Sequence, residues 1–105
     1  MAFAPGQYSV LQVRLAPDFI KQIRICAHTN DQYCYQVYEE AITRFVNKRR
    51  RTKKIPQYLS PPKSGKLLNV QVSKELHEKI KLIIQEDNIA QISFLYTALV
   101  SYFQA

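Results

Sequence analysis

Glycine is scarce in this sequence of 105 residues, which contains only Gly6 and Gly65. A glycine-rich loop of the kind that holds nucleotide phosphates is therefore missing, and neither H-E-x-x-H nor a nucleophile elbow occurs. No uncharged apolar run approaches the ~18 residues that a membrane span needs. We therefore expect neither an enzyme nor a membrane protein.

Cysteine is also rare, and two residues, Cys26 and Cys34, do not form a disulfide framework. The N-terminal sequence MAFAPGQYS lacks the basic start and apolar stretch of a secretory signal. Both observations favour a reducing cytoplasm. The order Cys26, His28, Cys34 matches no common zinc site, so we expect no metal and no other cofactor.

Acidic residues are absent from one segment, residues 48–66, which accounts for the whole net charge of +7. Its eight cations are Lys48, Arg49, Arg50, Arg51, Lys53, Lys54, Lys63 and Lys66. The same segment contains three prolines and Gly65, a composition typical of a linker. The charge favours an anionic partner, and nucleic acid is the first candidate.

The sequence on either side of this segment repeats. A shift of 57 residues places residues 10–48 over 67–105 without a gap, with identities at Leu11/Leu68, Val13/Val70, Ile23/Ile80 and Ala41/Ala98. We interpret the chain as one pseudo-symmetric domain over 1–105. It comprises a first unit at 10–47, a basic linker at 48–66 and a second unit at 67–105.

Each unit begins with strict alternation of apolar and polar residues, which predicts half-buried strands at 10–15 and 67–72. Helices are expected to start at Pro17-Asp18 and Lys74-Glu75, because proline and an acidic residue suit the first helical turn. Asn30-Asp31 and Asp87-Asn88 interrupt the helical pattern. Second helices then run to about Asn47 and to near the C-terminus.

A unit of about 40 residues cannot bury enough apolar surface alone, and one strand cannot satisfy its own hydrogen bonds. We therefore predict that the two strands pair antiparallel while four helices enclose a shared core. The expected fold is mainly α with one two-stranded antiparallel ribbon. Strand–helix–helix occurs twice, as an intramolecular pseudo-dimer.

The segments QVRLAPDFIKQIRICA and NVQVSKELHEKIKLII resemble the ribbon-helix-helix superfamily of DNA-binding proteins, the class of the Arc, MetJ and CopG repressors. Because both halves lie in one chain, the sequence is similar to tandem members such as TraY-like and Vir-type accessory proteins of conjugative DNA transfer. The usual glycine turn and serine-rich start of the second helix are replaced by Asn30-Asp31-Gln32-Tyr33-Cys34 and Asp87-Asn88-Ile89-Ala90-Gln91.

The resemblance implies that a two-stranded ribbon enters the major groove of DNA. It assigns base contacts to the outward strand positions, here Val10, Gln12, Arg14, Leu67, Asn69 and Gln71. Arginine pairs with guanine, and glutamine or asparagine with adenine. The expected phosphate contacts are Gln32, Tyr33, Arg49, Arg50, Arg51, Lys53, Lys54 and Lys66. Because the two strands differ, we expect an asymmetric recognition site.

The expected partner is duplex DNA in a bacterial nucleoid or plasmid, with other nucleoprotein-complex proteins and self-association on DNA left open. The role is either transcriptional regulation or assembly of a DNA-transfer complex. A small protein-interaction module, antitoxin-like or a helical adaptor, is the alternative. Binding of RNA is the third and least favoured function, because the narrow major groove of duplex RNA does not admit a ribbon.

Overall fold

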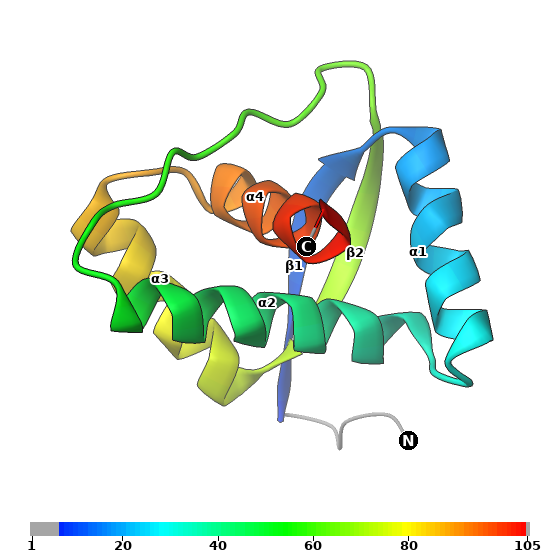
Figure 1. Ribbon diagram of the computed structural model, residues 1–105, viewed down its shortest axis with the longest axis horizontal. Coiled ribbons are helices and arrows are strands. Elements are labelled where there is room, and N and C mark those ends of the chain that lie inside the picture. Colours follow the sequence, from blue (N-terminus) through cyan, green and yellow to red (C-terminus); the bar gives the residue numbers. More distant parts are fainter. Residues whose placement is uncertain (1–6, 105) are drawn as a thin grey trace.

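The computed structural model describes residues 7–104, which form one two-stranded antiparallel sheet and four helices (Figure 1). The elements in chain order are β1 Tyr8–Leu15, α1 Pro17–Thr29, α2 Cys34–Arg51, β2 Lys66–Ser73, α3 Lys74–Asp87 and α4 Gln91–Gln104. None of the helices in this range is both long and apolar enough to cross a membrane. The mainly helical fold with one antiparallel ribbon is confirmed. Residues 1–6 lie outside the described residues, and they include most of the N-terminal sequence MAFAPGQYS that was compared with a secretory signal.

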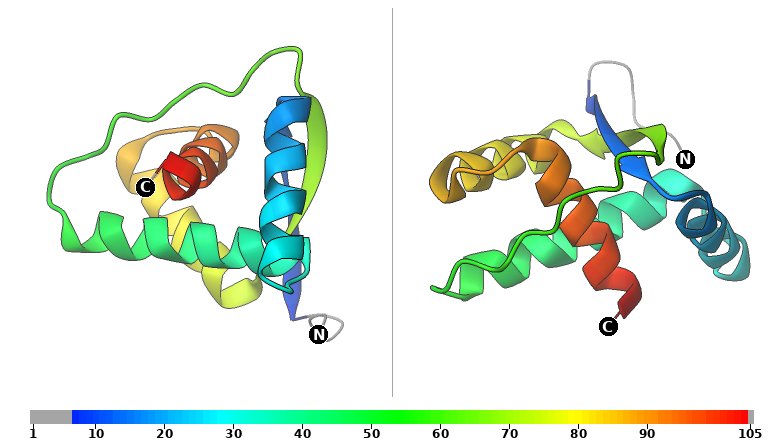
Figure 2. Two further views of the ribbon diagram at one scale, coloured as in Figure 1. Left: turned by 45° about the vertical axis from the view of Figure 1, so that its right-hand side comes forward. Right: turned by 90° about the horizontal axis from the view of Figure 1, so that it is seen from above.

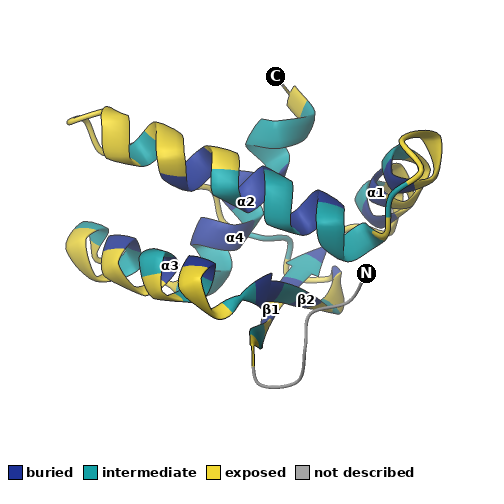
Figure 3. Cartoon of the chain, turned by 90° about the horizontal axis from the view of Figure 1, so that it is seen from below, coloured by how far each residue is buried: buried dark blue, intermediate teal, exposed yellow. Residues whose placement is uncertain are grey.

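β1 and β2 pair along their whole length, with Gln12 directly opposite Asn69. The alternation in the sequence decides which side chains the ribbon buries, because successive residues of a strand point to opposite faces. Val13 and Val70 are fully buried on the inner face. Helices α2 and α4 cover that face and supply most of the remaining core (Figures 1 and 3).

The helix boundaries follow local chemistry. Pro17 opens α1, where its missing N–H costs nothing, and the Ser73 hydroxyl caps α3 by accepting the Leu76 N–H at 3.2 Å. Asp31 and Asn88 take left-handed backbone angles, with φ of 54° and 53°, in the connections that follow α1 and α3. Asparagine and aspartate tolerate this conformation, so the predicted interruptions are confirmed.

Helix α2 ends at Arg51, four residues beyond the expected end at Asn47. Its last turn therefore contains Lys48, Arg49, Arg50 and Arg51, which the sequence pattern had placed in a linker. Lysine and arginine are good helix formers, and their charges suit the negative C-terminal end of the helix dipole. The connection between the two halves is thus residues 52–65, which we call the strap.

The strap packs against the helices on its way from α2 to β2 (Figure 1). The ring of Tyr58 lies 6.2 Å from that of Phe45 on α2 and 6.1 Å from that of Phe94 on α4. The Leu59 N–H donates to the hydroxyl of Thr97, which is buried in α4, at 2.8 Å. Side-chain packing and a backbone hydrogen bond therefore hold this segment in place, unlike a solvated linker.

Candidate nucleic-acid interface

The outer face of the ribbon brings together all six residues predicted to contact bases. They form three directly opposed pairs, Val10–Gln71, Gln12–Asn69 and Arg14–Leu67, and we call this set the outer ribbon face. The Gln12 amide nitrogen donates to the Asn69 side-chain oxygen at 3.3 Å, while both residues remain exposed. Two amide groups with spare donors and acceptors thus occupy the centre of the face.

Apolar side chains stand on either side of this polar centre. Val10 is 51% exposed and Leu67 is 44% exposed, although both residue types usually favour the interior. They lie diagonally across the ribbon, one on each strand. The outer ribbon face therefore combines hydrogen-bonding amides with apolar side chains of a size that can contact a thymine methyl group.

Arg14 occupies one end of the face, where it is partly buried. Its Nη1 donates to the backbone oxygen of Gly65 at 2.6 Å, which ties the side chain to the last residue of the strap. A guanidinium has five N–H donors in a planar fork, so this hydrogen bond leaves donors for an outside acceptor. Arg14 thus connects the strap to the outer ribbon face.

A helix N-terminus flanks the ribbon on each side. Beside β2, a hollow of about 450 Å³ lies between the strand and the first turn of α2, where Cys34 and Tyr35 line it. Beside β1, a hollow of about 500 Å³ is lined by Gln91 and Ile92 at the start of α4. Helix N-termini carry partial positive charge and N–H donors, which attract anions such as phosphate.

Gln32 and Tyr33, two of the predicted phosphate contacts, lie at the start of α2 on this side of the molecule. Tyr33 is 65% exposed, and its ring stacks on that of Tyr35 at 5.7 Å. Its backbone N–H donates to the Gln36 side chain at 2.8 Å, which stabilises the first turn. Lys66 begins β2 opposite Leu15, at one end of the ribbon.

Arg49, by contrast, belongs to a buried ion pair. Its Nε and Nη2 donate to the two carboxylate oxygens of Asp87 at 2.8 and 2.5 Å, and the Tyr58 hydroxyl donates to the same carboxylate at 2.6 Å. The side chain of Asp87 is fully buried and that of Arg49 is 13% exposed. Arg49 is therefore not available for the phosphate contact that the sequence predicts, because Asp87 neutralises its charge.

These hydrogen bonds also shift proton affinities. Donation from Arg49 holds the pKa of the Asp87 carboxyl below its usual range, because it stabilises the charged form. Burial, followed by the hydrogen bond to Asp87, raises the pKa of Tyr58 well above that of an ordinary tyrosine. The cluster is thus an ionised carboxylate held by one cation and one neutral phenol, and it joins α2, α3 and the strap.

The remaining predicted phosphate contacts lie at the C-terminal end of α2. They are Arg50, Arg51, Lys53 and Lys54, all of them exposed. In Figures 2 and 3 this end of α2 lies on the far side of the molecule from the two strands. The structure therefore does not bring these four cations together with the outer ribbon face, and the two sets of predicted contacts do not form one continuous surface.

Three residues that hold the strap or the ribbon end in place received no site role from the sequence: Tyr58, Gly65 and Asp87. Tyr58 is the one aromatic residue of the segment 48–66, which is a signal for a buried contact. Gly65 and Asp87 carry no such local signal. Among residues 7–104, no group of three or more histidine, cysteine, aspartate or glutamate side chains is arranged to hold a metal ion.

Comparisons with known proteins add no relative to this description. No family model, no curated protein and no solved structure matches the chain.

Proposed function

We propose that the chain is a single-chain ribbon-helix-helix protein that binds duplex DNA and catalyses no reaction. One observation carries the proposal: the exposed outer ribbon face is flanked on both sides by a helix N-terminus. The major groove of B-DNA is about 12 Å wide and admits a two-stranded ribbon. Helix N-termini on either side would then meet the phosphates that border the groove.

The register of the ribbon supports an internal pseudo-dimer. Gln12 and Asn69 are separated by the 57 residues of the sequence repeat, and they lie directly opposite each other. A twofold axis between two equivalent strands has to pass between equivalent residues, as it does here. The same offset relates Asp31 to Asn88, the two residues with left-handed backbone angles.

Base recognition follows from the side chains on the outer ribbon face. The amides of Gln12 and Asn69 can each pair with adenine, and the free donors of Arg14 can reach guanine. Val10 and Leu67 can contact thymine methyl groups. Phosphates are held by the first turns of α2 and α4, next to Gln32 and Tyr33, and by Lys66 at the ribbon end.

The two strands of the ribbon present different side chains, so the preferred DNA site is expected to be asymmetric. Selection from a random duplex pool, followed by sequencing of the bound fraction, measures this directly. The expected result is a motif whose two halves differ, because Gln12 and Arg14 face Asn69 and Leu67 across the ribbon. Recovery of perfect palindromes alone would contradict it.

Replacing Gln12 and Asn69 together with alanine is expected to lower base discrimination at the positions that these two amides contact, and to leave the fold intact. Each good amide–base pair discriminates by ~1–3 kcal/mol, so the preferred site should lose roughly tenfold or more per position relative to random DNA. The measurement is competition binding by fluorescence anisotropy. Gln85→Ala, at an exposed position on α3, is the matched control. Unchanged discrimination in the double variant would reject the proposed contacts.

The same architecture serves two biological roles, regulation of transcription and assembly of a DNA-transfer complex. Both require a protein that recognises one duplex site through fixed side chains. We favour assembly of a DNA-transfer complex, because a chain that contains both halves of the ribbon can bind an asymmetric site in one defined orientation. A transfer complex that works in one direction needs such an orientation.

A further inference from the structure

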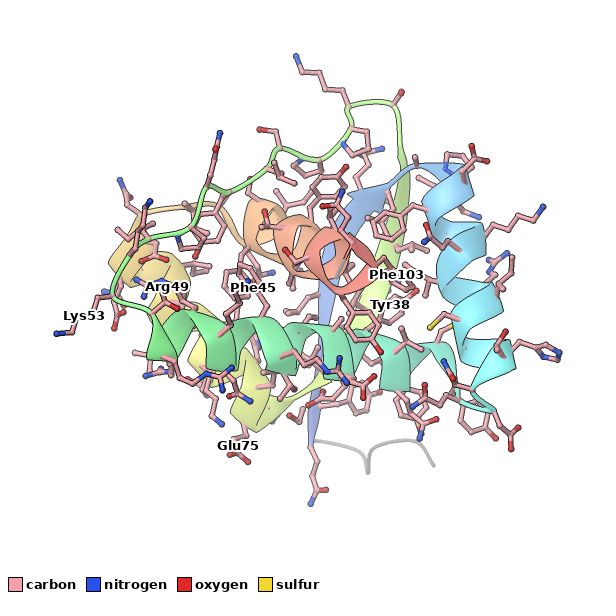
Figure 4. The ribbon with its side chains drawn as sticks, viewed as in Figure 1. Tyr38, Phe45, Arg49, Lys53, Glu75 and Phe103 are labelled. Carbon is pink, nitrogen blue, oxygen red and sulfur yellow. The ribbon has the colours of Figure 1, made fainter. Side chains whose placement is uncertain are left out.

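The C-terminal end of α2 carries a group of exposed cations that the outer ribbon face does not use. We call it the basic cap, and it consists of Lys48, Arg50, Arg51, Lys53 and Lys54. None of the five takes part in an ion pair with another described residue. Lys53 projects away from the body of the molecule beyond the helix end (Figure 4).

Helix stabilisation does not account for the whole cap. Cations in a last helical turn are favoured by the helix dipole, and the effect fades within that turn. Lys53 and Lys54 follow the last helical residue, Arg51, and lie in the strap. Five like charges without acidic partners repel one another, so an arrangement of this kind is stabilised by an outside polyanion.

Distance separates the basic cap from DNA bound at the outer ribbon face. The N-terminal turn of α2 flanks the ribbon, and a helix of 18 residues is ~27 Å long. The Debye length is about 8 Å at physiological salt. Cap charges roughly three Debye lengths away contribute little to a straight duplex held in the ribbon.

The surface beside the cap is concave and partly apolar. A cleft of about 500 Å³ lies between the end of α2, the start of the strap and α4, with Lys48 and Lys54 on its rim and Phe45 and Ile55 among its lining residues. Arg49 also borders this cleft, but its charge is neutralised by Asp87. Two of the five cap cations, Lys48 and Lys54, thus border a hollow against which a phosphate backbone can lie.

We propose that the basic cap binds the backbone of a second duplex DNA segment, so that one molecule bridges two segments. This inference rests on the proposed binding of a first segment at the outer ribbon face. Contacts to phosphates alone carry no base sequence, so the second segment is bound without sequence preference. Neutralising about five phosphates predicts a slope of log K against log salt of about −4.5. Affinity for the second segment then falls ~500-fold between about 0.05 and 0.2 M salt.

The test is a bridging assay. A duplex of about 15 base pairs carrying the selected site is fixed to beads, and capture of a fluorescent random duplex of equal length is measured. Both stay straight because the persistence length of DNA is about 150 base pairs. The cap variant is K48Q/R50Q/R51Q/K53Q/K54Q, which keeps Arg49 on Asp87. The control variant removes five other cations, K21Q/K63Q/K74Q/K79Q/K81Q.

The wild type and the control variant are expected to capture the random duplex. The cap variant should lose about 90% of this capture and keep its affinity for the fixed site within about threefold. Capture that survives in the cap variant would overturn the inference, because two associated copies, each holding one duplex at its outer ribbon face, would then form the bridge. A parallel loss of affinity for the fixed site would also overturn it, because the cap would then belong to one shared surface.

Failure of the proposed DNA binding at the outer ribbon face would give a different result from failure of the cap inference. The ribbon variant Q12A/N69A distinguishes the two failures, because it leaves every cation of the basic cap in place. If sequence preference is unchanged in that variant while the cap variant abolishes salt-sensitive binding, the ribbon assignment fails and the cap remains a DNA-binding surface. If the wild type binds neither duplex at about 0.05 M salt, both assignments fail.

Discussion

Replacing Asp87 with asparagine is expected to lower the free energy of unfolding by about 3 kcal/mol or more. The substitution removes the charge that neutralises Arg49, whose side chain is only 13% exposed. Removing one partner of a buried ion pair leaves an uncompensated charge and typically costs ~3–5 kcal/mol. It also weakens the hydrogen bond from Tyr58, which anchors the strap. Urea unfolding followed by circular dichroism measures the change.

The matched control for Asp87 is an exposed pair on the same helix. Glu75 forms an ion pair with Lys79, with 3.5 Å between the carboxylate oxygen and the ammonium nitrogen, and the glutamate side chain is 83% exposed. Replacing Glu75 with glutamine is expected to change stability by less than ~1 kcal/mol, because solvent screens such pairs. Equal effects of the two substitutions would show that the Asp87 cluster is no more than a surface ion pair.

The contribution of Asp87 also has a defined pH dependence. Its pKa is lower in the folded chain than in the unfolded chain, so its stabilisation is complete above the unfolded value of about 3.9. That contribution is lost as the pH falls below this value through the folded pKa. The difference in stability between the wild type and Asp87→Asn should therefore be constant from about pH 6 to 8 and shrink in acid.

Replacing Gly65 with alanine is expected to destabilise the protein by about 2–3 kcal/mol and to loosen the end of the ribbon. A Cβ atom at Gly65 would lie 2.7 Å from the backbone oxygen of Leu15 and 2.8 Å from its carbonyl carbon. Backbone atoms of a paired strand cannot move aside as a side-chain end can, and overpacking of this kind costs ~1–3 kcal/mol. The expected fall in melting temperature is roughly 10–15 °C for a chain of this size.

Gly65 also accepts the hydrogen bond from Arg14, so its substitution should reach the outer ribbon face. We expect Gly65→Ala to weaken discrimination at the base pair that Arg14 is proposed to contact, at temperatures where the variant is still folded. Ser64→Ala is the control, because Ser64 is the exposed neighbour in the strap and its loss should matter by less than ~0.5 kcal/mol. A Gly65→Ala variant as stable as this control would contradict the close approach of Gly65 to the backbone of Leu15.

The residues of the outer ribbon face could be predicted one by one, because the prediction depends only on the alternation of side chains along each strand. Once Leu11 and Val13 are placed inside, the period of a strand places Gln12 outside. The helix interruptions at Asp31 and Asn88 were equally local, since they depend on which residues tolerate left-handed angles. The register that places Gln12 opposite Asn69 came only from the structure, because antiparallel pairing by itself leaves the position of the axis open.

The basic segment was harder to interpret, because its charge resembled a solvated linker. The sequence shows that residues 48–66 contain eight cations and no acidic residue. It does not show which of these cations belong to a helix or which form an ion pair. Arg49 lies 38 residues from Asp87, and nothing near either residue predicts their contact. The strap was likewise expected to be part of a linker, and its composition did not predict that Tyr58 packs on two phenylalanine rings.

The sequence by itself determined the faces of the strands, the order of the elements and the places where helices break, because these depend on residues within a few positions of one another. Only the tertiary structure decided which cations remain available and on which side they lie. The availability of a charge depends on its burial and its partners, and those come from residues distant in the chain. Arg49 and Arg50 are neighbours of the same charge, yet the fold uses one internally and leaves the other to solvent.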